Sequence, residues 1–196
     1  MVLLAQELKL GLSLGFATLV VASSVMWKQF ANVKIKNIAH IVALTLFAIG
    51  WIGIVCTASL VIDLPHADPD SVIWNSKLFG VVVTGALLVI GFQLAVYFIP
   101  QKLESLRYTM LGLLLGAWAI AGVLFSMNIE YELPSFNDTP KLNNDKLPLC
   151  LVGAVFIAVS VLLTNLKVAE YISTALLALG WFLLAYGIAV IKKTAL

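Results

Sequence analysis

The chain has 196 residues, of which 62% are hydrophobic and only 11% are charged, and its formal net charge is +2. A soluble domain has about half apolar and a quarter charged residues, so this composition excludes an ordinary soluble fold and predicts one integral membrane domain over residues 1–196. The twelve basic residues are scattered, which argues against nucleic-acid binding, since a nucleic-acid-binding face needs clustered Lys and Arg to neutralise phosphates.

Six apolar runs without charged residues mark the predicted membrane spans in chain order. Each is about 18–25 residues long, the length that a helix needs to cross some 30 Å of hydrocarbon. Because a backbone inside lipid must satisfy its own hydrogen bonds, we expect helices rather than strands throughout these runs. The predicted fold is an all-α, polytopic transmembrane bundle of six helices, which cover residues 10–27, 38–62, 78–101, 108–129, 147–166 and 171–191.

The connections between the spans are of two kinds, which define two sides of the bundle. Side A consists of the short connections 28–37, 102–107 and 167–170, with six basic and two acidic residues, and side B consists of 63–77, 130–146 and both termini, with six basic and eight acidic residues. The positive-inside rule counts Lys and Arg, and this count is equal on the two sides. The first span breaks the tie, since one lysine precedes it and three follow it. We therefore expect side A in the cytoplasm and both termini on the opposite side of a membrane that the sequence does not identify.

Three tryptophans stand in the interior of the second, fourth and sixth spans rather than at their ends. Trp51 and Trp181 each follow an Ala-aliphatic-Gly triplet, and Trp118 follows the looser Leu-Gly-Ala. They lie ten to thirteen residues into their spans, or about 15–20 Å at 1.5 Å per residue, which predicts mid-bilayer depth. Either the rings fill space beside small residues, or they converge on an axis and form an apolar constriction. Packing is the simpler interpretation, because depth alone does not show that the rings face inward.

Lysines that open the odd-numbered spans predict three similar helical hairpins. Lys9-Leu10, Lys77-Leu78 and Lys146-Leu147 recur at offsets of 68 and 69 residues, and the three tryptophans recur at offsets of 67 and 63. Three related hairpins would be arranged about a pseudo-threefold axis along the membrane normal. Lysines also commonly flank spans, and evenly spaced hairpins look periodic without any duplication, so the sequence leaves true repetition open.

Small residues spaced four apart predict faces for close helix packing. Gly11 and Gly15 form one such pair and Gly112 and Gly116 form another, and pairs of this kind let two helix backbones approach closely in lipid. We expect them to pack inside the bundle, with dimerisation as the alternative. Gln93 is the most polar group within a span, and its carboxamide predicts either a hydrogen bond across a helix interface or a group that lines a pore.

Chemically active residues are scarce in this sequence. No Asp, Glu, Lys or Arg falls within the six predicted spans, which argues against ion pumps, proton relays and voltage sensors, because these need ionisable groups at depth. The sequence also lacks a nucleophile with a matched base, a zinc-protease motif and a Gly-rich phosphate loop. We therefore expect no catalytic residue, no enzymatic activity and no cofactor.

The side-B connections hold the few residues that could act as ligands. Asp63, His66, Asp68 and Asp70 could bind a cation, but they are too few for calcium and of the wrong kind for zinc, and neighbouring prolines make them typical of turns. We therefore expect no metal site. An enzyme acting on lipid would need these side chains to converge, and this is the weakest interpretation. Asn137 begins a glycosylation sequon, although the proline after the sequon disfavours its use.

The two cysteines are too few for a disulfide framework. Cys56 and Cys150 both lie in apolar runs toward side B, where a thiol usually behaves as a small hydrophobe. We expect free thiols, with a single bridge between helices as the alternative if side B faces an oxidising compartment.

The function that these patterns favour is structural. Charge-free spans, close-packing motifs and the lack of any chemical constellation predict a non-catalytic structural or accessory subunit of a larger membrane assembly. Its partners would be the lipid bilayer and other membrane-protein subunits, in a respiratory-type complex, an organelle membrane or the internal membrane of a virus. The alternative is a passive channel for a small neutral solute, with Trp51, Trp118 and Trp181 around its lumen.

Overall fold

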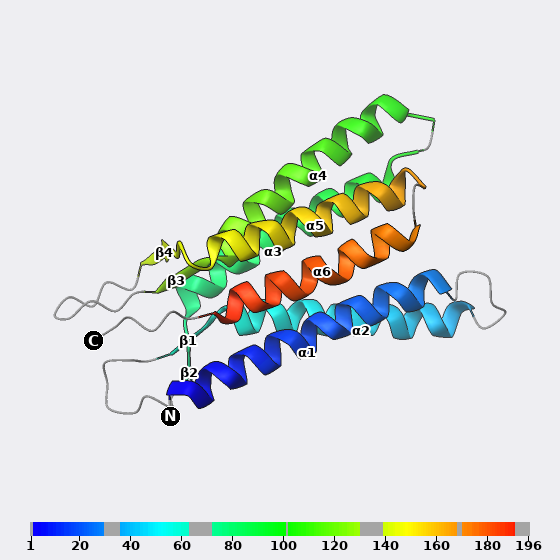
Figure 1. The fold of residues 1–196 in the computed structure, drawn as a ribbon. Helices are drawn as coiled ribbons and strands as arrows, with labels where there is room; N and C mark the ends of the chain where they lie inside the picture. The colour runs from blue at the N-terminus through cyan, green and yellow to red at the C-terminus, as the bar shows by residue number, and fades with distance from the viewer. Residues whose placement is uncertain are drawn as a thin grey trace.

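Six long helices make up almost all of the structure, a computed structural model that describes residues 2–29, 36–62, 72–100, 102–129, 139–167 and 170–190. All six are long and apolar enough to cross a membrane, which confirms the predicted all-helical architecture. Figure 1 shows them aligned along one direction, with the two short β-hairpins at the end of the bundle where the first helix begins. The helices are α1 (Val2–Gln29), α2 (Lys36–Ala58), α3 (Ser76–Phe98), α4 (Glu104–Phe125), α5 (Leu147–Asn165) and α6 (Glu170–Ala189).

The helices pair in chain order as three hairpins. The most extensive contacts are those of α1 with α2, α3 with α4 and α5 with α6. Neighbouring hairpins meet through an even helix of one and an odd helix of the next: α4 packs on α5, α6 packs on α1 and, less extensively, α2 packs on α3. The three hairpins therefore form a ring, and its loosest joint lies between α2 and α3.

Two short β-hairpins, which were not predicted, follow α2 and α4. β1 (Leu60–Ile62) pairs with β2 (Val72–Trp74), and β3 (Met127–Ile129) pairs with β4 (Pro140–Leu142), both antiparallel. The predicted helices over 38–62 and 108–129 are therefore wrong at their C-terminal ends. Strands and membrane helices are equally apolar, so hydropathy does not separate them.

A serine ends each of these two helices. The hydroxyl of Ser59 donates to the carbonyl of Val55 at 2.7 Å, and the hydroxyl of Ser126 donates to the carbonyl of Val123 at 2.6 Å. These bonds return to the last helical turn, as serine side chains near a helix end commonly do. The following three residues then pair with the opposite strand, so the backbone stays hydrogen-bonded without further helix.

Two helices begin at least one helical turn before their apolar runs. α1 begins at Val2 and α4 begins at Glu104, eight and four residues before the predicted starts at 10 and 108. Charged residues end an apolar run, but Lys, Glu and Arg are good helix formers and do not end a helix. Lys9 consequently lies inside α1 rather than in front of it.

Polar side chains tie hairpins together on side A. The Lys28 ammonium of α1 donates to the Thr174 hydroxyl of α6 at 3.3 Å, and the Arg107 guanidinium of α4 donates to the Asn165 side-chain oxygen of α5 at 2.9 Å. These bonds cross the α1–α6 and α4–α5 joints of the ring. They hold the side-A ends of neighbouring hairpins in register.

Glycines set the helix separation in the first and third hairpins. A Cβ on Gly153 of α5 would lie 2.6 Å from the backbone nitrogen of Leu184 in α6, and a Cβ on Gly180 would lie 2.8 Å from the carbonyl oxygen of Gly153. In the first hairpin, a Cβ on Gly50 would lie 2.9 Å from the carbonyl oxygen of Phe16. Any side chain at these positions would push the helices apart.

The four glycines predicted to pack helices lie elsewhere. Gly11 and Gly15 on α1, and Gly112 and Gly116 on α4, are exposed, and a Cβ at any of them would meet open space. They do not hold helices of this chain together. Packing of these faces against another protein stays a prediction.

We expect Gly153→Ala to destabilise the protein by about 1–3 kcal/mol, because the added methyl group overpacks the α5–α6 contact. Gly112→Ala is the matched control. It faces open space and is expected to be neutral or to stabilise by up to about 1 kcal/mol, since alanine is the better helix former. Thermal unfolding of both variants in detergent measures the difference, and an equal loss in both would contradict the packing role of Gly153.

Candidate functional site

The tryptophan side chains of the three even helices meet in the core of the bundle. Their ring centroids lie 5.8 Å apart for Trp51 and Trp118, 5.0 Å for Trp51 and Trp181, and 5.8 Å for Trp118 and Trp181. Trp181 stands nearly perpendicular to the other two rings, at 87° and 84°, which is the edge-to-face geometry that aromatic pairs favour. All three residues are at most 5% exposed. We call this cluster the indole triad.

The rings reach one level because they stand at similar distances from the ends of their helices. Trp51 and Trp118 each lie seven residues before the last residue of α2 and α4, and Trp181 lies eight before the last residue of α6. This is about 10–12 Å from the side-B helix ends at 1.5 Å per residue. The triad is therefore nearer to side B than the sequence predicted, because α2 and α4 end before their apolar runs do.

The indole triad bridges helices that otherwise touch little. The even helices pack mainly on odd helices, and the contact of α2 with α6 is small. Rings at centroid separations of 5.0–5.8 Å are in van der Waals contact, so they occupy the space between the even helices rather than line an opening there. The ring of Phe47 extends the cluster, with its centroid 6.4 Å from that of Trp51.

Two indole N–H groups of the triad find no hydrogen-bond acceptor in the part of the chain that the structure describes. Those of Trp51 and Trp118 are buried and unpartnered among the described residues. An unpaired buried donor costs about 1–3 kcal/mol, so such groups are the points in the core where a water molecule or a ligand acceptor would bind.

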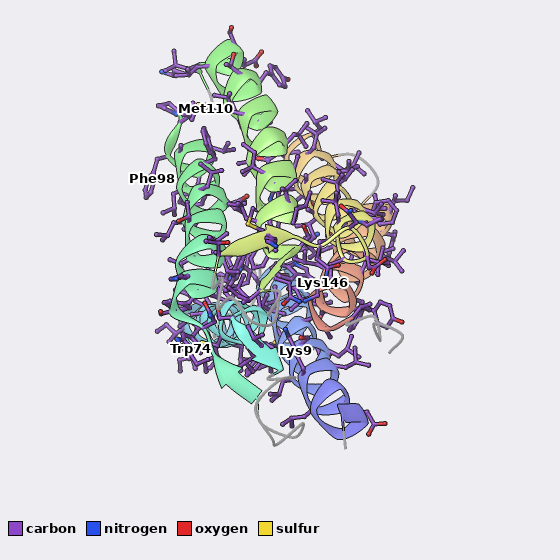
Figure 2. The ribbon with its side chains drawn as sticks, turned by 90° about the vertical axis from the view of Figure 1, so that its left-hand side faces the viewer. Lys9, Trp74, Phe98, Met110 and Lys146 are labelled. Atoms are coloured by element: carbon purple, nitrogen blue, oxygen red, sulfur yellow. The ribbon has the colours of Figure 1, made fainter. Side chains whose placement is uncertain are left out.

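A second group of buried polar side chains lies at the side-B end. Lys9 of α1 is 1% exposed, and Lys146, which directly precedes α5, is 2% exposed. The Lys9 ammonium donates to the Leu60 carbonyl, just past the end of α2, at 2.6 Å. Lys9 and Lys146 interact electrostatically, and both interact with the Cys150 side chain. We call Lys9, Lys146 and Cys150 the buried lysine cluster; Figure 2 looks onto this end of the bundle and labels both lysines.

The buried lysine cluster corrects the expectation that charged groups only flank the spans. The start of α1 at Val2 places Lys9 within a helix, and neighbouring helices cover it. The signal was present in the Lys-Leu pairs that open the odd spans, of which only Lys77 is exposed. Hydropathy does not distinguish a buried lysine from one that reaches out to water.

Burial changes the proton affinity of Lys146. It lowers the pKa of this ammonium from 10.5 to about 8, because the charged form loses its hydration, and the nearby Cys150 partly opposes the change. The backbone at this position is held by Asn143, whose side-chain oxygen accepts hydrogen bonds from the N–H groups of Asp145 and Lys146 at 3.0 and 3.1 Å.

Gln93 and Cys56 do not join either cluster. Gln93 is exposed on α3 rather than buried between helices, and Cys56 and Cys150 are free thiols. In the part of the chain that the structure describes, no group of three or more His, Cys, Asp and Glu could hold a metal ion. The side-B candidates outside the described residues are Asp63, His66, Asp68, Asp70 and Asn137.

Comparison of the chain with family models, with curated proteins and with solved structures finds no match in any of the three.

Lys146→Met is expected to raise stability at neutral pH and to flatten its dependence on pH. In the wild type the unfolded chain protonates this lysine near 10.5 and the folded chain only near 8. The stability of the wild type therefore rises as the pH rises through this interval. Below pH 8 the buried lysine destabilises the folded state by the full amount. The full difference is on the order of 3 kcal/mol.

Thermal unfolding at a series of pH values, in a buffer with a bulky anion, measures this effect. Lys102→Met removes an exposed lysine on side A and is the control, with the pH profile of the wild type. A Lys146→Met profile that is as steep as the wild-type profile would contradict the prediction.

Proposed function

We propose that this chain is an integral, multi-pass membrane protein that acts as a non-catalytic structural or accessory subunit of a larger membrane assembly. The observation that carries the proposal is the filled core of the bundle, where the indole triad occupies the space between the even helices. A protein that conducts a solute needs an open path through its core. A structural subunit needs only a stable apolar body.

The outer surface supports a membrane location with lateral contacts. Ile41, Leu44 and Ile52 on α2 are 60–65% exposed, and lipid or protein would cover them without the cost that water imposes. The exposed glycines of α1 and α4 add two faces at which the helix of another subunit could approach closely. Extraction from the native membrane in mild detergent tests this proposal. A chain that runs as a monomer with no co-purifying subunit would contradict it.

We further propose that the three hairpins are internal repeats about a pseudo-threefold axis along the membrane normal. Two observations support this relation: each even helix packs on the odd helix of the next hairpin, and the three tryptophans stand at similar distances from their helix ends. Lys9, inside α1, and Lys146, directly before α5, are both buried, and each precedes a leucine. The second hairpin departs from the pattern, with an exposed Lys77 and a looser joint to α2.

Sidedness follows from the positive-inside rule, and we propose that side A faces the cytoplasm. In a background without Cys56 and Cys150, Lys102→Cys on side A is expected to resist a membrane-impermeant maleimide added to the non-cytoplasmic face. Asn144→Cys, which is exposed at the side-B end, is expected to react. Permeabilisation should make both react, which controls for accessibility. The reverse pattern would mean that side B faces the cytoplasm. Labelling of both cysteines from one face would mean that sides A and B do not lie on opposite faces of the membrane.

A passive channel for a small neutral solute is the second candidate. The convergence of three tryptophans favours a channel, because a hydrophobic constriction needs apolar side chains that meet at one level. The two indole N–H groups that are unpartnered among the described residues favour it as well, because they could donate hydrogen bonds to the acceptor atoms of a solute. In that function the indole triad would be a closed gate.

Trp118→Ala separates the two functions. In a structural subunit the variant loses roughly 3–5 kcal/mol of stability, because it leaves a cavity, and vesicles that contain it stay impermeable to glycerol. In a channel the same variant opens the gate, and glycerol flux in stopped-flow measurements rises. Trp74→Ala, at a half-exposed position on β2, is the control and should change neither quantity much.

The outcomes of the flux measurement are distinct. Impermeable vesicles with alanine at Trp51, Trp118 and Trp181 in turn would reject the channel. Channel-like flux through the wild type without any partner would reject the structural subunit.

A further inference from the structure

The buried lysine cluster places two basic side chains in the interior of the side-B end. Lys9 and Lys146 are 1% and 2% exposed. Lys9 donates one hydrogen bond, to the neutral Leu60 carbonyl, and among the described residues the group that raises the pKa of Lys146 is the Cys150 thiol rather than a carboxylate. When both lysines are protonated, two buried like charges without a counter-charge are among the costliest arrangements in a protein interior. The arrangement calls for an anion.

Two further features lie on the helices that contain or follow the two lysines. Ser13 follows Lys9 by one helical turn on the same buried face of α1; it is 0% exposed, and its hydroxyl is unpartnered among the described residues. α5 begins at Leu147, directly after Lys146, so the positive end of its helix dipole lies at the cluster. An ammonium pair, a hydroxyl and a helix N-terminus all favour a bound negative charge.

We propose that the buried lysine cluster, with Ser13 and the N-terminus of α5, binds a small inorganic anion such as chloride. Burial selects for size: lysine residues that are 1% and 2% exposed leave little access for a phospholipid headgroup, whereas a monatomic anion is little larger than a water molecule. The anion neutralises the charge that the fold buries. The site is independent of the proposed function, because a structural subunit and a channel could each contain it.

Anion-dependent stability of the wild type tests the site directly. The melting temperature is measured while chloride replaces gluconate, which is too bulky to enter, at constant ionic strength. It is expected to rise and then to saturate, because a ligand that binds only the folded state stabilises it by mass action. Broadening of the chloride NMR line by the protein, reversed by bromide, reports the same binding without unfolding.

Lys146→Met is expected to weaken the chloride response about ten- to a hundredfold, the loss that corresponds to one charge-assisted hydrogen bond. In gluconate alone its melting temperature should equal or exceed that of the wild type, since an uncompensated charge has been removed. Lys9→Met is the second variant, in case one of the two does not fold, and Ser13→Ala should give a smaller loss. Lys102→Met, at an exposed side-A lysine, is the control and should keep the full response.

Three results would overturn the proposal. The first is a wild type that responds to neither chloride nor bromide in both measurements. The second is a Lys146→Met variant that is destabilised equally in chloride and gluconate, which would mean that an acidic group of this chain neutralises the lysine. The third is an equal loss of response in Lys146→Met and Lys102→Met, which would mean that chloride acts on the surface charge alone.

Discussion

The contact among three indole rings is the interaction on which the arrangement of the helices depends. Trp51, Trp118 and Trp181 come from three different hairpins, and the even helices that carry them otherwise pack on odd helices. In lipid no hydrophobic effect drives helices together, so van der Waals contact and hydrogen bonds must hold them. Glycines within the first and third hairpins bring the paired helices close, and the large rings span the wider gap between hairpins.

The two ends of the bundle differ in chemistry. On side A, Lys28 and Arg107 make hydrogen bonds between neighbouring hairpins and remain partly exposed. On side B, Lys9 and Lys146 are buried near Cys150, and the helices α2 and α4 give way to β-hairpins. On side A, hydrogen bonds therefore link the ends of neighbouring helices, whereas side B encloses two basic side chains. An anion that enters the interior of this protein meets its strongest electrostatic attraction at side B.

A structural role and an anion site are compatible. A bundle whose core is filled by aromatic side chains has no need of buried charge for stability, and replacement of buried charges by apolar residues often stabilises a protein. The proposed anion would stabilise the side-B end by binding to the folded state, which would link the stability of the protein to its ionic surroundings.

The all-helical fold and the six helices long enough to span a membrane could be read from the amino-acid sequence, because the transfer free energy of an apolar run is a sum over its own residues. The inward direction of Trp51, Trp118 and Trp181 could not, since every face of these helices is apolar and only the neighbouring helices decide which face is covered. The same reason explains why Gly112 is exposed while Gly153 is packed, although both stand in similar runs.

The ends of α2 and α4 depended on strand partners 10 or more residues away in the chain, which hydropathy along a single span does not register. The burial of Lys9 and Lys146 was likewise decided by the tertiary structure, because a lysine at the end of an apolar run reaches water unless other helices close over it.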